Sequence, residues 1–192
     1  MDKSVVLEKY YDFLDERNEY SNESEELYLK YLISLNNYVY DPYVLLMELY
    51  FKNNELEKGI EIINLGYSRL MKKEFNNKFP KQLDYLELEN RSIYRLIYNY
   101  ADMLWFVEEN ENALNIFKKL LKINPNDNLG VRYSICGMLE GYSSSRHVWN
   151  ENSQIISNWY NDKVIKYLEI KEYSFLKKFL FWTGVMRITS ST

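Results

Sequence analysis

The chain carries one histidine and one cysteine, His147 and Cys136, so few side chains could perform catalysis. His147 follows a run of serines at 143–145, and a serine or cysteine nucleophile needs an adjacent base that takes its proton. A catalytic triad would have to assemble around this single histidine from distant parts of the chain. The sequence therefore predicts that the protein is not an enzyme.

Metal and nucleotide sites find equally little support. A zinc site takes about four nitrogen or sulfur ligands, and one histidine with one cysteine cannot supply them. The alternating asparagines of 124–128 imitate the start of a calcium loop, but Leu129 replaces the turn glycine and Ile135 the closing glutamate. The acids of 12–19 are typical of a solvated helix face, and the six glycines lack the spacing of a phosphate-binding loop. We expect no metal and no cofactor.

Composition narrows the fold and the partners. The 192 residues suffice for one domain, and only six glycines, three prolines and two alanines occur among them. So few turn residues nearly exclude an all-β fold. The net charge of the chain is −4: residues 1–90 carry a net negative charge and the remaining residues a net positive one. Nucleic-acid affinity comes largely from cations on phosphates, so a nucleic-acid-binding repeat that stacks bases on tyrosine, tryptophan and arginine is disfavoured.

The two ends of the chain bear on its location. The start lacks a basic region followed by an apolar run, so we expect no signal peptide. Near the other end the longest uncharged stretch is 179–186, far short of the ~20 residues of a membrane span. A lone cysteine fits a reducing compartment, so we expect a cytoplasmic protein without membrane association. The basic, aromatic segment 171–187 is expected to cap the helices, with a membrane-interface helix as the alternative.

Apolar residues recur at helical spacing through most of the chain. Residues 3–16 place Val6, Tyr10 and Phe13 on one face, and Asn22 with Glu25 predicts a capping box for the next helix. That second helix is expected to bury Leu27, Tyr31, Leu32 and Leu35. Asp41 is expected to cap a helix that begins at Pro42 and ends near Lys52. Further helices are expected at 55–74, 89–107, 112–123, 128–139, 153–160, 162–170 and 172–187.

These helices contain a repeated pattern of bulky and small residues. In the tetratricopeptide pattern of about 34 residues, the second helix carries a small residue four positions before an aromatic one, and a proline follows. The pattern also has a small residue after a bulky one in the first helix, and Ala101 after Tyr100 fits it. In the second helix Ala113 lies four positions before Phe117, and Pro125 follows. Upstream the same frame holds Tyr43, Leu46, Met47, Tyr50, Gly59 and Ile63. Gly59 and Gly66, inside a helix, predict that neighbouring helices cross closely, because glycine there costs about 1 kcal/mol relative to alanine.

Residues 41–142 thus resemble the tetratricopeptide repeat family. The stretch from Leu88-Glu89-Asn90-Arg91 to Asn124-Pro125-Asn126-Asp127-Asn128-Leu129-Gly130-Val131-Arg132-Tyr133 is similar to a group of prokaryotic tetratricopeptide proteins with ENRP and NPNDNxGxRY motifs. The resemblance implies an all-α fold: a short array of antiparallel helical hairpins in a right-handed superhelix. Residues 1–40 are then expected to form N-terminal helices, as a cap or a degenerate repeat, and residues 143–192 a C-terminal helical extension or cap.

The resemblance also implies a binding groove, because the first helices of such hairpins line a concave surface where peptides or partner helices dock. The groove positions projected onto this chain are Glu48, Phe51, Arg95, Tyr98, Asp102, Trp105, Asn128 and Arg132. The alternative for these residues is structural: Tyr98 and Trp105 would pack against the next helix, and Arg95 and Arg132, like Arg91, would pair with acids or cap helices. Asp41, Val44 and Glu48 are not the cations of a carboxylate clamp, so recognition of a peptide C-terminus is disfavoured.

We therefore expect a non-enzymatic protein–protein interaction module, a scaffold that holds a partner protein or peptide in its groove. The alternative from a different class is a structural or self-assembling protein. It would form homodimers or larger homo-oligomers through its aromatic-rich outer surfaces, and its own terminal helix would fill the groove.

Overall fold

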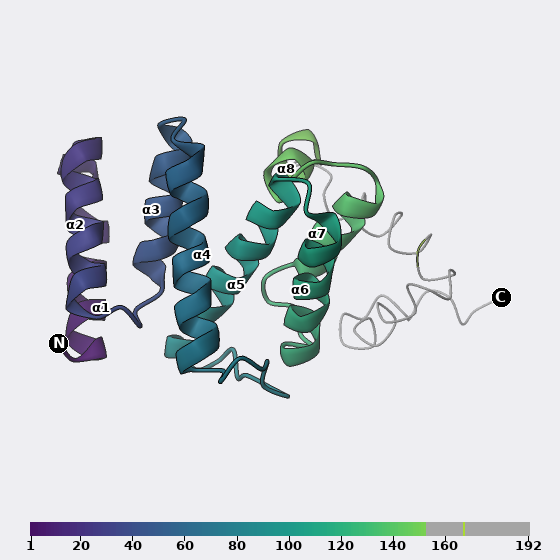
Figure 1. Cartoon of the computed structure of the whole chain (residues 1–192), viewed down its shortest axis with the longest axis horizontal. Helices are drawn as coiled ribbons and strands as arrows, with labels where there is room; N and C mark the ends of the chain where they lie inside the picture. Colours follow the sequence, from purple (N-terminus) through teal and green to yellow (C-terminus); the bar gives the residue numbers. More distant parts are fainter. Residues whose placement is uncertain (153–166, 168–192) are drawn as a thin grey trace. The chain divides into compact units, whose positions relative to one another are not determined.

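The computed structural model describes residues 1–152 and Tyr167, and this part of the chain is helical, without a β-strand. Its elements are α1 (Lys3–Glu16), η1 (Arg17–Glu19), α2 (Asn22–Leu35), α3 (Asp41–Lys52), α4 (Leu56–Lys73), α5 (Leu88–Phe106), α6 (Asn110–Ile123), α7 (Val131–Leu139) and α8 (Ser145–Asn152) (Figure 1). The all-α class is thus confirmed for the described part. The helices expected at 153–160, 162–170 and 172–187 lie outside the described residues.

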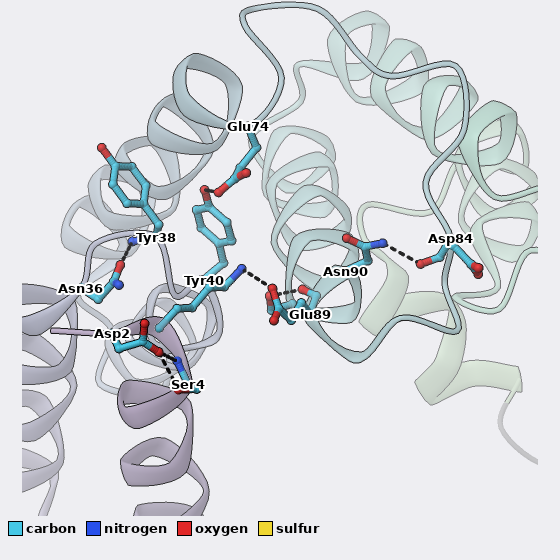
Figure 2. Close-up of polar contacts among 11 residues, drawn as sticks. Asp2, Ser4, Asn36, Tyr38, Tyr40, Glu74, Asp84, Glu89 and Asn90 are labelled. Carbon is cyan, nitrogen blue, oxygen red and sulfur yellow. Dashed lines mark hydrogen bonds and ion pairs between the residues drawn. The ribbon is translucent and has the colours of Figure 1, made fainter.

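Side-chain caps set the first helix starts. Asp2 accepts the backbone N–H of Ser4 at 2.9 Å at the start of α1 (Figure 2). At α2 the cap is Ser21, which accepts the N–H of Ser24 at 3.2 Å, so the capping box predicted at Asn22 is wrong by one residue. Asn22 is instead the first helical residue.

Two later helix starts also differ from their predictions. Asp41 does not cap α3; it is the first helical residue, and Tyr40 precedes the helix. Helix α7 begins at Val131 rather than at residue 128, because Asp127 accepts the N–H of Val131 at 2.7 Å across the intervening loop. Gly130 ends that loop at φ 70°, a left-handed conformation that glycine adopts without strain.

Helix α2 buries only part of the set predicted: Leu32 is buried and Leu35 half-buried, but Leu27 and Tyr31 are not. Glu25, Leu29 and Leu32 are buried, whereas Leu27 is 69% and Tyr31 46% exposed. The burial of Glu25 has a local cause: Arg17 in η1 holds its carboxylate at 2.7 Å. The ion pair across the turn thus allows a charged residue to lie on the buried side of α2 with Leu29 and Leu32.

The described chain forms two units, and α5 runs from one to the other. The first unit is residues 1–80 with 84–100, and the second is residues 81–83 with the chain from 101 onward. No helix of the described residues is both long and apolar enough to cross a membrane.

Close crossings of three helices organise the first unit. A Cβ atom on Gly66 of α4 would lie 3.0 Å from side-chain atoms of both Tyr43 on α3 and Leu96 on α5. Gly59 likewise faces α3, where a Cβ would meet the ring of Phe51. The close approach predicted from these two glycines is confirmed. Farther along α4, Tyr67 stacks on Tyr100 of α5 with 3.8 Å between ring centroids.

Candidate interaction face

A buried carboxylate connects α3 to the part of α5 in the first unit. Asp41 is only 3% exposed, and its two oxygens accept hydrogen bonds from Arg95 Nε at 2.7 Å and Arg95 Nη2 at 2.8 Å. The guanidinium fork matches the carboxylate geometry, which makes such bidentate pairs both strong and directional. The Arg95 side chain is 41% exposed, so its outer part remains at the surface. Asp41 therefore fixes where Arg95 lies on this face.

Helix α1 adds two adjacent tyrosines to the same place. Tyr10 is buried beside Asp41 and Arg95, and its ring centroid lies 5.7 Å from that of Tyr11. Burial raises the pKa of the Tyr10 phenol, and the charges of Asp41 and Glu48 raise it further. Tyr10 thus stays a neutral phenol, while Tyr11 is 51% exposed. Side chains of α1, α3 and α5 consequently meet around one ion pair.

A second contact ties α1 to the start of α5. Lys3 Nζ lies 3.4 Å from Glu89 Oε2 at the surface. The side chain of Asn90, which follows Glu89, donates a hydrogen bond to the Asp84 carbonyl at 2.8 Å (Figure 2). The Ser92 hydroxyl donates to the Glu89 carbonyl, also at 2.8 Å. These bonds order the first turn of α5 and the loop before it.

Four of the predicted groove residues lie in the first unit. Glu48 is exposed on α3, and Phe51, Arg95 and Tyr98 are half-buried. The charges of Glu48 and Arg95 both shift the pKa of Tyr10, in opposite directions, so both lie within electrostatic range of its phenol. Their use in binding stays a prediction. We name the surface of Lys3, Tyr11, Glu48, Glu89 and Arg95 the α1/α3/α5 face.

Sequence reasoning missed the contribution of α1. Tyr10 and Tyr11 lie outside the repeat pattern, which begins at residue 41, so no groove position was projected onto them. The adjacent tyrosines themselves were the available signal: with Tyr10 in the buried stripe of Val6 and Phe13, Tyr11 must point to one side of it.

In the second unit, two of the predicted groove residues make packing and capping contacts. Trp105 is 2% exposed; its Nε1 donates to the Tyr142 carbonyl at 2.7 Å, and its ring packs edge-on against Phe117. Asp102 accepts the N–H of Ser145 at 2.8 Å and so caps the start of α8. Burial raises the pKa of Asp102, and the bond from Ser145 opposes that rise.

Arg132 is buried as well, whereas Asn128 is exposed. The Arg132 guanidinium lies 3.2 Å from Asp127 and donates to the Pro125 carbonyl at 3.1 Å. Arg91 also bonds the backbone, at the Tyr85 carbonyl. The structural alternative for the arginines therefore describes their observed contacts, and we leave Asp102, Trp105 and Arg132 out of the binding surface proposed below.

The residues that could do chemistry are poorly arranged for it. Burial raises the pKa of the Cys136 thiol to about 12, so the thiolate nucleophile is scarce at neutral pH. Ser143 Oγ and His147 Nδ1 lie 3.2 Å apart, but both side chains are exposed to water. Among the described residues no group of three or more histidines, cysteines and acids could hold a metal ion.

No protein-family model, curated protein or solved structure matches this chain. The tetratricopeptide resemblance therefore remains a prediction from the spacing of its small and aromatic residues.

Proposed function

We propose that this protein is a non-enzymatic interaction module that binds a peptide, or an extended segment of a partner protein, on the α1/α3/α5 face. One observation carries the proposal: the Asp41–Arg95 pair holds side chains of three helices around an exposed tyrosine and an exposed carboxylate. Tyrosine and arginine are enriched in binding hot spots. Side chains that are already ordered also lose less entropy when a ligand binds.

The chemistry of the remaining residues supports a role without catalysis. The only cysteine of the chain is buried, and its raised pKa disfavours nucleophilic attack. The serine–histidine contact at the start of α8 is open to water, which weakens the directed proton transfer that nucleophilic catalysis requires. The tetratricopeptide-like spacing supports the same role, since that family binds peptides through the first helices of its hairpins.

The test is a selection of peptides followed by a measurement of their affinity. A library of random peptides is displayed and selected on the immobilised full chain, and the dissociation constant of the best peptide is measured by titration calorimetry. The double variant Tyr11→Ala, Glu48→Lys removes the exposed ring and reverses the exposed charge. We expect it to weaken binding at least about tenfold, the effect of losing a hot-spot residue.

A matched variant tests whether the effect belongs to this face. Glu61→Lys, Leu65→Ala changes an exposed acid and an exposed apolar residue on α4 and should leave the affinity within about twofold. Circular dichroism should show equal helicity in all three proteins. Failure to select any peptide, or equal weakening by both double variants, would refute the proposal.

A further inference from the structure

The last turns of α4 carry three cations close together. Arg69 lies three residues before Lys72 and four before Lys73, so the three side chains share one side of the helix. Lys72 and Lys73 are exposed, and Arg69 is half-buried. Residues 1–90 are acidic overall, so this cluster is a local reversal of charge. We name the surface of Arg69, Lys72 and Lys73 the basic patch.

The carboxylates of the first unit do not neutralise the basic patch. Other cations of this unit lie within 3.4 Å of a carboxylate oxygen: Lys3, Arg17, Lys30, Lys58 and Arg95. Within the described part of the chain, no ion pair involves a patch cation. Glu74, the acid next to Lys73, instead accepts a hydrogen bond from the Tyr40 hydroxyl at 3.5 Å (Figure 2). The patch cations therefore remain available to an anion from outside the unit.

Two tyrosine rings hold the patch cations in place. Lys73 Nζ lies 5.2 Å from the ring centroid of Tyr38, and Arg69 Cζ lies 5.7 Å from that of Tyr43. Arg69 also donates a hydrogen bond to the Tyr43 hydroxyl. A ring attracts a cation without neutralising its charge. Long side chains that are already held in this way lose less entropy when a ligand binds.

The small size of the patch indicates which class of anion it fits. From Arg69 to Lys73 the helix rises only about 6 Å, and charges beyond about 8 Å are largely screened at physiological ionic strength. A short run of carboxylates contacts the patch alone, because consecutive residues of an extended peptide are about 3.3 Å apart. A nucleic-acid backbone or an anionic membrane extends well beyond the patch and meets the acids of the same unit.

We propose that the basic patch binds an acidic segment of a partner protein, in which several aspartates or glutamates follow one another. The patch shares no residue with the α1/α3/α5 face, so its test does not depend on peptide binding there.

The experiment measures binding of fluorescein-labelled hexaglutamate to the full chain by fluorescence anisotropy. We expect saturable binding at an ionic strength of about 0.02 M that weakens at about 0.15 M, because salt screens the attraction. Lys72→Glu, Lys73→Glu should weaken binding at least about fivefold, since each substitution replaces an attraction by a repulsion. Lys72→Gln, Lys73→Gln removes the charges without opposing the dipole of α4 and should give an intermediate affinity.

A matched variant separates the patch from the total charge. Lys9→Glu, Lys52→Glu changes the net charge of the chain equally, and Lys52 also lies in the last turn of its helix, α3. Gly59 of α4 lies against Phe51, and Lys72 is 13 residues farther along, so about 20 Å separates the two helix ends. This variant should keep the affinity within about twofold, and circular dichroism should show equal helicity in all four proteins.

Two further probes distinguish the classes of anion. An oligothymidylate of the same charge as hexaglutamate, and vesicles that contain phosphatidylserine, should both bind more weakly than hexaglutamate. No binding of hexaglutamate at low ionic strength, equal weakening by both charge-reversed double variants, or tighter binding of either other probe would overturn the proposal.

Discussion

Each of the two units contains a buried aspartate side chain paired with an arginine, and the two pairs differ in how far apart their partners lie in the sequence. In the first unit Asp41 and Arg95 are 54 residues apart and join α3 to α5 through two bonds of 2.7 and 2.8 Å. In the second unit Asp127 and Arg132 are five residues apart, and Arg132 Nη1 lies 3.2 Å from Asp127 Oδ2. The first pair connects separate helices, whereas the second belongs to one helix start.

An aspartate–arginine pair therefore has a different structural role in each unit. Asp127 also accepts the N–H groups of Val131 at 2.7 Å and of Arg132 at 3.1 Å, so it satisfies backbone donors that the first turn of α7 would leave unpaired. Asp41 lies inside the first turn of α3, and its side-chain oxygens bond Arg95. The local pair therefore stabilises a helix, and the distant pair positions a surface.

The largest expected effect is at the local pair. Asp127→Ala removes the acceptor of two backbone N–H groups and leaves the charge of Arg132 buried beside a smaller side chain. Breaking a buried ion pair from one side costs about 3–5 kcal/mol, and we expect a loss of this size in the free energy of unfolding. Urea denaturation followed by circular dichroism measures it. A loss under about 1 kcal/mol would mean that water or another group replaces the carboxylate.

The distant pair should have a smaller effect, because Arg95 is partly exposed and water can reach the vacated position. Arg95→Ala leaves Asp41 buried without its two bonds, and we expect a loss of about 1–3 kcal/mol in the free energy of unfolding. Asp41→Asn, Arg95→Met replaces the pair by neutral groups and should recover part of that loss. Urea denaturation of both variants tests the comparison. A double variant less stable than Arg95→Ala would show that the pair is not an independent contact.

The contrast between the pairs also explains what the sequence could predict. Helical spacing located most helices, and the small residues marked real close crossings: Gly66 lies against Tyr43 and Leu96. The spacing of residues can predict helices and close crossings because both depend on contacts within one helix or between consecutive helices. The start of α7 at Val131 was missed by three residues, since Asp127 spans the loop before it.

The α1/α3/α5 face was predicted only in part for a related reason. Glu48 and Arg95 were chosen from the repeat pattern, and both act on Tyr10. The partner of Arg95, however, is an acid 54 residues away, and no local pattern identifies it. Leu27 and Tyr31 were wrongly predicted to be buried because apolar residues occupy more than one side of α2, and the burial of Glu25 beside Arg17 cannot be anticipated from apolar periodicity.

The smallest expected effect is a dependence on pH that distinguishes the local pair. Burial raises the pKa of Asp127 to about 6, although Arg132 and the two backbone N–H groups oppose the rise. Because the folded-state pKa lies above the unfolded value of about 3.9, the native protein binds the proton more tightly. This contribution to stability is fully present below about pH 4 and is lost as the pH rises through about 6.

Asp127→Asn isolates this titration, because it keeps one acceptor and removes the ionisable group. The free energy of unfolding of the wild type, minus that of the variant, should fall by about 1 kcal/mol between about pH 5 and pH 7. The subtraction cancels the titration of the other carboxyl groups. Urea denaturation of both proteins at several pH values measures the difference. A difference that rises with pH would instead show that the interaction of Asp127 with Arg132 outweighs the burial of its carboxylate.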